Sequence, residues 1–376
     1  MGQRQGALEG VGVMVPGFWR GRRVLVTGHT GFKGAWLAAW LARMGAEVTG
    51  YAHAPAGEPN LFALCRLETR IRSVIGDIND RPRLAQAMAD ARPDIVLHLA
   101  AQSLVRPSYE DPIGTFATNV TGVVTLLDVV RRTPGIASVV VVTSDKCYDN
   151  REWVWGYREA DRLGGRDPYS ASKGCAEIAA QSMQRSFFKP FTPQGHSARI
   201  ATVRAGNVIG GGDWSADRLV PDIVRGCLGP EGVVRLRNPQ SVRPWQHVLE
   251  PLGAYLILAE RLATAPDGVD EAWNIGPDPG DDRPVREVAQ AMAQALGAGR
   301  IDIETQPHAP HEARLLRLDC AKAKSQLGWH PRLRFADAIR LTADWYAAWH
   351  RGADMEAMTH AQIDAYAAAL EAPAFG

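Results

Sequence analysis

Lysine is scarce in this chain of 376 residues, where six lysines stand beside 36 arginines. Three of the six, Lys33, Lys146 and Lys173, lie in short motifs together with Gly, Ser, Asp or Tyr. The surroundings of a lysine ammonium readily shift its pKa, whereas a guanidinium keeps its proton. These three lysines are therefore the first candidates for chemistry in a chain that otherwise uses Arg for its cations.

Paired cysteines and a large net charge are also missing. The five cysteines are scattered and form no Cys-x-x-Cys pair, which argues against a disulfide framework and predicts no metal site. Unpaired thiols favour a reducing cytoplasm. The formal net charge of +1 argues against a nucleic acid or a membrane surface as partner. The apolar segment 7–19 is broken by Gly and Pro and is too short to span a bilayer.

Apolar runs rich in β-branched residues alternate with stretches of helical spacing over the first 205 residues. The runs at 94–102 and 137–145 lack period-two alternation, as strands buried on both faces do. This order predicts an α/β fold, a Rossmann-type doubly wound parallel sheet. The predicted strands are 22–28, 48–55, 73–78, 94–102, 137–145 and 198–210, and the predicted helices are 35–48, 83–93, 114–133 and 169–188.

Beyond residue 205 the elements become shorter, which predicts a smaller C-terminal substrate-binding lobe. The segment 233–248 is interpreted as a strand followed by a loop. Helices are predicted within 210–227, 251–264, 285–297, 319–329 and 338–349, and a strand within 272–277. We expect a Rossmann domain over 18–205 to which elements around 244–276 return, a lobe over 206–243 and 277–350, and a helical tail over 351–376.

A glycine-rich loop follows the first predicted strand and opens the first predicted helix. In that place backbone N–H groups and the helix N-terminus cradle a pyrophosphate, which predicts a dinucleotide site. The strand 48–55 carries neither an acidic residue for a ribose 2′-hydroxyl nor an Arg for a 2′-phosphate, so this loop leaves NAD and NADP both open. The predicted cofactor contacts are Gly28, Thr30, Gly31, Phe32, Lys33, Gly34, Asp77, Ile78, Ala100, Ala101, Gln102, Asn119, Tyr169 and Lys173.

Tyr169 and Lys173 lie four residues apart at the start of a predicted helix, so they share one face. An ammonium near a phenol stabilises the phenolate, and lowering a Tyr pKa from about 10 to about 7 takes roughly 4 kcal/mol. We predict that Tyr169 is a base for a substrate hydroxyl. Ser144, at the carboxyl end of a parallel strand where ligands bind, can hydrogen-bond the same oxygen.

Asp145 and Lys146 add an acid and a base beside this set. A simple dehydrogenase needs only Ser, Tyr and Lys, so the extra pair suggests a second proton transfer such as the elimination of water. Further along the chain, arginines suited by their planar fork to a pyrophosphate follow the last strand of the sheet. The predicted substrate contacts are Asn207, Arg218, Arg237 and Arg243.

The motifs TGHTGFKG, HLAAQSLVRPSY, TSDKCYDN, DPYSASKGCAE, RAGNVIGGGDW and RPWQHVLEPL occur in this order. From about Phe18 to Trp345 the chain resembles the extended short-chain dehydrogenase/reductase superfamily, and within it the CDP-glucose 4,6-dehydratases. The related dTDP-glucose dehydratases carry Thr-Asp-Glu at the place of Ser144-Asp145-Lys146, and their Glu takes the C5 proton. The Lys here leaves open which group removes that proton.

The resemblance implies a hydro-lyase that converts CDP-D-glucose into CDP-4-dehydro-6-deoxy-D-glucose with tightly held NAD+. Tyr169 would deprotonate the C4 hydroxyl, and Asp145 would protonate the departing C6 hydroxyl. Lys146 would act at C5 as a base or an oxyanion stabiliser, and Asn207 and Arg243 would lie near the substrate diphosphate. The resemblance also implies a homodimer or a dimer of dimers, formed through helical faces such as the one within 114–130.

Three other functions are compatible with much of this pattern. One is a different nucleotide-sugar 4,6-dehydratase. A second is a 4-epimerase or reductase of the same superfamily, against which Asp145 and Lys146 weigh. A third is a non-catalytic NAD-binding regulator, against which the intact Tyr169 and Lys173 weigh.

Overall fold

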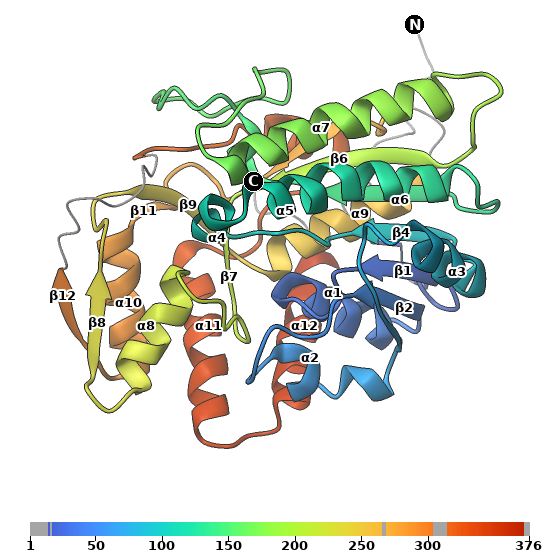
Figure 1. Ribbon diagram of the computed structural model, residues 1–376. Helices are drawn as coiled ribbons and strands as arrows, with labels where there is room; N and C mark the ends of the chain where they lie inside the picture. Colours follow the sequence, from blue (N-terminus) through green and yellow to red (C-terminus); the bar gives the residue numbers. More distant parts are fainter. Residues whose placement is uncertain (1–13, 16, 265–267, 304–313, 372–376) are drawn as a thin grey trace, which may run out of the picture.

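The computed structural model describes residues 14–15, 17–264, 268–303 and 314–371. Its main sheet has seven parallel strands in the order β10-β6-β5-β4-β1-β2-β3 (Figure 1). These strands are β1(Arg23–Thr27), β2(Glu47–Ala52), β3(Arg72–Ile75), β4(Ile95–His98), β5(Ser138–Val142), β6(Arg199–Ala205) and β10(Ala272–Ile275). The strand order reverses between β1 and β4, and ligands bind at such a switch point in doubly wound sheets. The predicted fold class is thus confirmed.

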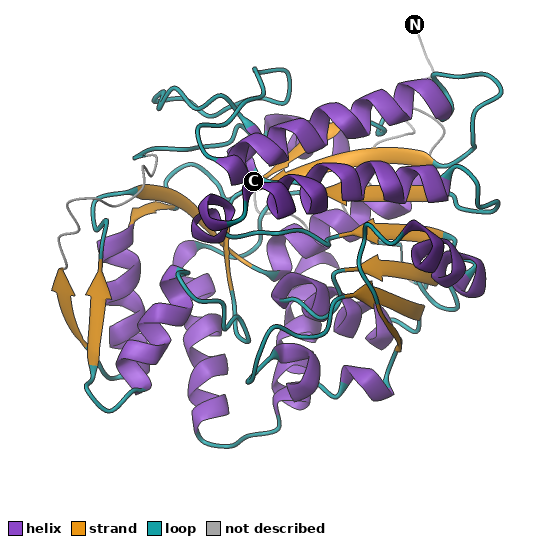
Figure 2. Ribbon diagram, in the orientation of Figure 1, coloured by secondary structure: helices purple, strands orange, loops and turns teal. Residues whose placement is uncertain are grey.

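The sheet is buried on both faces because its apolar side chains alternate between two separate cores. Val24 and Val26 of β1 belong to one core, whereas Leu25 belongs to the other. The first core contains residues of α1(Phe32–Arg43), α9(Leu249–Thr264) and α12(Met355–Glu371). The second contains residues of α3(Arg81–Ala91), α6(Gly122–Val130) and α7(Pro168–Phe187). Figure 2 shows these helix layers on either side of the strands.

Local sequence signals set where the helices of the second layer begin. Asp167 caps α7 by accepting a hydrogen bond from Ser170 N at 2.9 Å, and Pro168 occupies the first helical position. The same Asp-Pro pairing, Asp111 with Pro112, starts α5(Pro112–Phe116). Since the cap fixes the first turn of α7, it also fixes the place of Tyr169 in the second helical position. The short elements nearby are α2(Leu61–Leu64), η1(Leu67–Thr69), α4(Val105–Glu110), η2(Ala117–Thr121) and η3(Asp145–Cys147).

The smaller elements gather beside the carboxyl ends of the sheet, at the lower left of Figure 1. Two small sheets, β11-β9-β7 and β12-β8, pack with α8, α10 and α11. Their bounds are β7(Asn207–Ile209), α8(Leu219–Leu228), β8(Val233–Leu236), β9(Val242–His247), β11(Asp282–Pro284), α10(Val285–Leu296), β12(Arg300–Ile303), η4(Ala323–Leu327) and α11(Phe335–His350). The predicted domain boundaries stay a prediction, and residues 372–376 of the tail and most of the segment 7–19 lie outside the described residues.

Three element predictions are wrong. The strand predicted over 198–210 is two strands, because the chain leaves the main sheet at Gly206 and β7 pairs with β9 instead. The loop predicted after β8 contains β9, whose pairing on both edges overrides the weak strand signal of Pro244. The helix predicted over 35–48 ends at Arg43, where Gly45 with a φ of 81° lets the chain turn into β2.

Candidate active site

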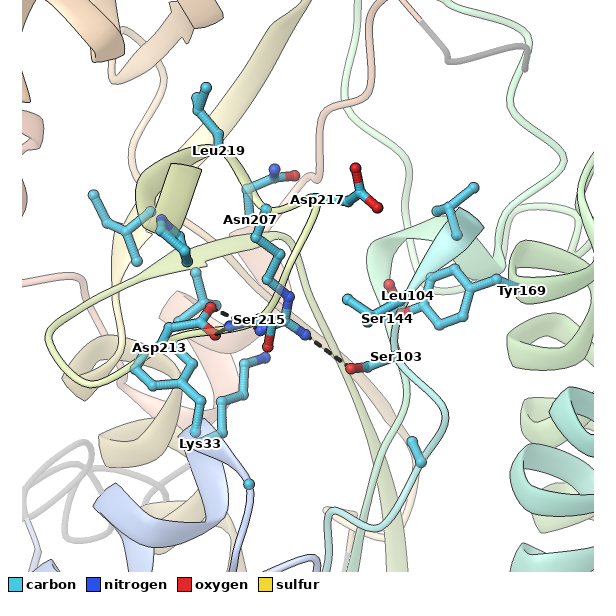
Figure 3. A pocket seen from close by; sticks show the side chains of 18 of the residues that line it. Lys33, Ser103, Leu104, Ser144, Tyr169, Asn207, Asp213, Ser215, Asp217 and Leu219 are labelled. Atoms are coloured by element: carbon cyan, nitrogen blue, oxygen red, sulfur yellow. Dashed lines mark hydrogen bonds and ion pairs between the residues drawn. The ribbon is translucent and has the colours of Figure 1, made fainter. Parts of the chain in front are cut away.

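A cleft of about 550 Å³ opens at the carboxyl ends of the strands, between the main sheet and the smaller elements (Figure 3). It is lined by the loops after β1, β4 and β5, by the first turns of α7, and by the segment 205–245. The structure brings most of the predicted site residues into this one cleft. They are Gly28, Thr30, Gly31, Phe32, Lys33, Gly34, Ile78, Ala100, Ala101, Ser144, Asp145, Lys146, Tyr169, Lys173, Asn207, Arg218, Arg237 and Arg243.

The glycine-rich loop has the shape that a pyrophosphate requires. Gly28 has a φ of 77°, and a Cβ there would lie 2.7 Å from Ala100 N. Gly31 precedes α1 and gives its first turn no side-chain cap, so the N–H groups at that helix end remain available for an anion. The residues present therefore fit a dinucleotide phosphate.

The adenosine side of the loop differs from the usual acidic strand end. β2 is followed by His53, whose Nε2 lies 3.4 Å from Asp77 Oδ2. Asp77 follows β3, the strand that pairs with β2, and its role as a cofactor contact stays a prediction. Asp77 itself is half exposed and does not line the cleft, although its neighbour Ile78 does.

Gln102 and Asn119 also lie beside the cleft and do not line it. Asn119 Oδ1 accepts a hydrogen bond from Gln102 N at 2.9 Å, and Asn119 Nδ2 donates to Ser172 Oγ at 2.8 Å. This side chain therefore ties the turn after β4 to helix α7. Their predicted role as cofactor contacts stays a prediction.

Ser144, Asp145 and Tyr169 meet where β5 ends and α7 begins (Figure 3 shows Ser144 and Tyr169). Ser144 Oγ donates to Asp145 Oδ1 at 3.0 Å and also hydrogen-bonds the Tyr169 hydroxyl. Asp145 Oδ2 is buried and has no hydrogen-bond partner among the described residues. Gly206 leaves room for this carboxylate, since a Cβ at Gly206 would lie 3.1 Å from that oxygen. Burial raises the pKa of Asp145, which favours a protonated, proton-donating acid.

Of the motif lysines in the cleft, Lys173 is buried and Lys33 is half-buried. Burial lowers the pKa of Lys173 to about 8, although Glu177 one turn further along α7 opposes the shift. Burial also lowers the pKa of Lys33 to about 8, with Arg218 adding to the effect. The third, Lys146, has its Nζ 5.8 Å from the centre of the Tyr169 ring. The three lysines singled out by their rarity thus surround the same space.

The expected lowering of the Tyr169 pKa is not what the structure gives. Burial raises the pKa of Tyr169 to about 12, and its hydrogen bond with Ser144 opposes the shift without reversing it. The spacing of Tyr169 and Lys173 places both on one face of α7, but the Tyr169 side chain is buried. Desolvation of the phenolate is therefore the larger effect in the protein chain alone.

The predicted diphosphate arginines line the cleft and already have acidic partners. Arg218 Nη1 donates to Asp213 Oδ2 at 2.9 Å, and Arg237 Nη1 donates to Asp217 Oδ1 at 2.7 Å. Arg243 is buried on β9 and stabilises the charged form of Asp145 through its own charge. Asn207 stands at the start of β7 on the same wall.

Sequence reasoning missed a buried ion pair behind the site. Glu177 accepts hydrogen bonds from Thr143 Oγ1 at 2.5 Å, Thr202 Oγ1 at 2.8 Å and Arg204 Nη2 at 2.7 Å. Arg204 Nη1 continues the network to Tyr148 Oη at 2.8 Å. The network clamps the segment before and after Ser144 to α7. The one signal for it was the position of Glu177, four residues beyond Lys173.

A glycine loop at the switch point of a parallel sheet, with Ser, Tyr and Lys in the same cleft, defines a short-chain dehydrogenase/reductase. Within that class, the chain belongs to the GDP-mannose 4,6-dehydratase family, whose model matches residues 25–342. A CDP-glucose 4,6-dehydratase from Salmonella typhimurium is 50% identical over 352 residues, which cover 94% of this chain and 98% of that protein.

Two further relatives extend the comparison. A dTDP-glucose 4,6-dehydratase from Streptomyces antibioticus is 31% identical over 336 residues, which cover 86% of this chain and 92% of that protein. The crystal structure of a dTDP-glucose 4,6-dehydratase from Streptomyces venezuelae, solved with NAD bound, superposes with a TM-score of 0.74. That structure is 25% identical and covers 89% of this chain and 99% of its own. These three relatives are all nucleotide-sugar 4,6-dehydratases.

Proposed function

We propose that this chain is a hydro-lyase that converts CDP-D-glucose into CDP-4-dehydro-6-deoxy-D-glucose and water. The reaction uses no co-substrate, and NAD is regenerated in each cycle. The observation that carries the proposal is the meeting of Ser144, Asp145 and Tyr169 in the cleft that the glycine-rich loop lines. The identity of 50% to a CDP-glucose 4,6-dehydratase supports the choice of nucleotide and sugar.

The residues of the first half-reaction act at C4 of the glucose ring. Tyr169 takes the proton of the C4 hydroxyl, and Ser144, which hydrogen-bonds the Tyr169 hydroxyl, holds the same oxygen. Lys173, a cation with a pKa of about 8, favours the phenolate form of Tyr169. The loop 28–34 and Ile78 would hold NAD, which would supply the acceptor for the hydride from C4 and the donor of that hydride to C6.

The residues of the second half-reaction eliminate water across C5 and C6. Asp145, whose pKa is raised by burial, donates a proton to the C6 hydroxyl, which leaves as water. The C5 proton passes to a base as the double bond between C5 and C6 forms, and a proton returns to C5 when the hydride is delivered to C6. Lys146 stands beside Tyr169 on the same side of the cleft and serves as the base or the oxyanion stabiliser at C5. An acid at Asp145 is what a simple epimerase does not need.

The test is mass spectrometry of the product from each of CDP-, UDP-, dTDP- and GDP-glucose incubated with the protein and NAD. Our proposal expects a product lighter than CDP-glucose by one water and no conversion of the other three. A product of unchanged mass would support the epimerase alternative. Conversion of a different nucleotide-glucose would keep the dehydratase mechanism and correct the substrate.

The proposed enzyme assembles as a homodimer or a dimer of dimers in the cytoplasm. Among the described residues one helical stretch, Pro112–Val130, is long and apolar enough to cross a membrane, and it packs against α3 and α7. Ile113 and Val124 on this stretch and Ile178 on α7 are exposed, which supports a protein partner on this face. All five cysteines are unpaired, as a reducing compartment favours. Sedimentation equilibrium of Ile178→Glu, with the exposed Val154→Glu as control, tests the assembly.

A further inference from the structure

The segment 213–218, which we call the strap, contacts residues on the opposite side of the cleft, next to the main sheet. Arg218 Nη2 donates to Ser103 Oγ at 2.8 Å, a bond drawn as a dashed line in Figure 3. One residue earlier, Asp217 Oδ1 lies 3.3 Å from Arg106 Nη1. Ser103 and Arg106 both follow β4, whereas the strap follows β7. The strap is therefore held at two successive residues by the opposite wall of the cleft.

One carboxylate oxygen of the strap lies between two guanidinium groups. Asp217 Oδ1 is 2.7 Å from Arg237 Nη1 and 3.3 Å from Arg106 Nη1. Arg237 follows β8 and Arg106 belongs to α4, so the two cations come from opposite walls. All three residues line the cleft. An anionic oxygen between convergent Arg forks is the arrangement in which proteins bind phosphate.

The ion pairs of Asp217 with Arg106 and Arg237 can be displaced by an anion of higher charge. The side chains of Arg106, Asp217 and Arg237 are 37%, 39% and 25% exposed, and partly exposed ion pairs contribute little to stability. Asp217 also has a φ of 61°, a conformation that non-glycine residues seldom adopt and that is held here by the contacts of its side chain. A diphosphate brings more negative charge to the same pair of arginines than one carboxylate does.

We propose that Asp217 occupies, in the free protein, the position between Arg106 and Arg237 that the diphosphate of the nucleotide sugar takes. Entry of the substrate displaces the carboxylate and removes one of the two contacts between the strap and the opposite wall, and departure of the product lets Asp217 return. The carboxylate thereby lowers affinity for nucleoside diphosphates and sets a limit on how tightly product is held. The inference rests on the proposed function only for the identity of the ligand.

The experiment compares wild-type protein with Asp217→Asn by isothermal titration calorimetry against inorganic pyrophosphate, CDP and cytidine. Asn tolerates the same backbone conformation and removes only the charge. We expect about fivefold tighter binding of pyrophosphate and CDP, which corresponds to about 1 kcal/mol, and a change within about twofold for cytidine. Asp302→Asn is the matched control, because Asp302 pairs with Arg300 on β12 away from the cleft and its loss changes the net charge equally.

Several outcomes overturn the proposal. Unchanged or weaker binding of pyrophosphate to Asp217→Asn would mean that Asp217 holds the arginines in place for the ligand. Equally tighter binding of pyrophosphate to Asp302→Asn would mean that net charge alone causes the effect. If wild-type protein bound neither pyrophosphate nor CDP, there would be no anion site between the two arginines. The pyrophosphate titration needs no base or sugar, so tightening there alongside inactivity toward every nucleotide-glucose would reject the proposed function and keep the role of Asp217.

Discussion

Two buried carboxylates, Glu177 and Asp145, lie near Ser144 and differ in their hydrogen-bond partners. Glu177 receives hydrogen bonds from two threonines and an arginine, and both of its oxygens are engaged. Asp145, on the side of the cleft, receives one hydrogen bond from Ser144, and its second oxygen has no partner among the described residues. The two groups are of the same chemical kind and similarly buried, and their partners distinguish them.

The difference separates a structural carboxylate from a reactive one. A buried carboxylate paired with a cation and fully hydrogen-bonded stays charged and holds its partners in place. At Asp145 desolvation outweighs the nearby charges of Lys146 and Arg243, so burial raises its pKa. Glu177 thus fixes the geometry around Ser144, whereas burial raises the pKa of Asp145, which we propose as the acid.

The largest effect is expected from breaking the structural pair. Arg204→Met would leave Glu177 as an uncompensated charge in the core, and we expect the free energy of unfolding to fall by about 3–5 kcal/mol. Urea unfolding followed by circular dichroism measures it. The double variant Glu177→Gln with Arg204→Met removes both charges and should recover much of that loss. If Arg204→Met were as stable as wild type, the pair of Glu177 and Arg204 would not contribute to the stability of the fold.

On the reactive side, Tyr169→Phe should lower turnover of CDP-glucose by at least about 100-fold, the usual effect of losing a general base. The fold should remain native, since Tyr169 Oη is not part of the Glu177 network. Tyr109→Phe, on exposed α4, is the matched control and should leave turnover unchanged. Near wild-type turnover with a native circular dichroism spectrum would refute the role of Tyr169.

Asp145→Asn should divide the reaction into its halves. Oxidation at C4 uses groups that the change leaves intact, whereas departure of the C6 hydroxyl needs a proton that Asn cannot donate. We expect 6-deoxy product to form about 100-fold more slowly while the absorbance of reduced nicotinamide exceeds that of wild type in a single turnover. Asp344→Asn, at an exposed site on α11, controls for the change of charge. Formation of product at the normal rate would exclude Asp145 as the acid.

A third buried carboxylate, Glu250, sharpens the comparison because its partners are neutral. It accepts hydrogen bonds from Arg332 N at 2.7 Å, Leu333 N at 2.6 Å and Tyr366 Oη at 2.9 Å, and burial raises its pKa to about 7. The folded state then binds the proton more tightly than the unfolded state. The stability from this group is complete below about pH 4.5 and is lost as the pH rises to about 7.

The expected loss between about pH 5.5 and about pH 7.5 is about 2 kcal/mol in the free energy of unfolding. Glu250→Gln does not titrate, so its unfolding free energy should decline less over this interval than that of wild type. Chemical denaturation at a series of pH values measures the difference between the two proteins. Parallel pH dependence in both would mean that Glu250 titrates alike in the folded and unfolded chains.

The sequence alone determined the fold class and most of the residues that line the candidate site. Alternating apolar runs and helical spacing predict the parallel sheet, because strands buried on both faces cannot alternate in polarity. Tyr169 and Lys173 could be predicted from the sequence because they lie four residues apart in one helix. The Asp167-Pro168 cap that places them is also local in the sequence. The glycines of the loop were found for the same reason, since a turn between a strand and a helix is specified by adjacent residues.

The tertiary structure decided what depends on residues distant in the chain. β9 forms because β7 and β11 pair with it, although its own sequence contains Pro244. The raised pKa of Tyr169 comes from burial by surrounding elements and opposes what its spacing to Lys173 suggested. The pairing of Glu177 with Arg204 and that of Asp217 with Arg106 join segments 27 and 111 residues apart. A contact between segments so far apart depends on how whole elements pack, and no local pattern of residues encodes it.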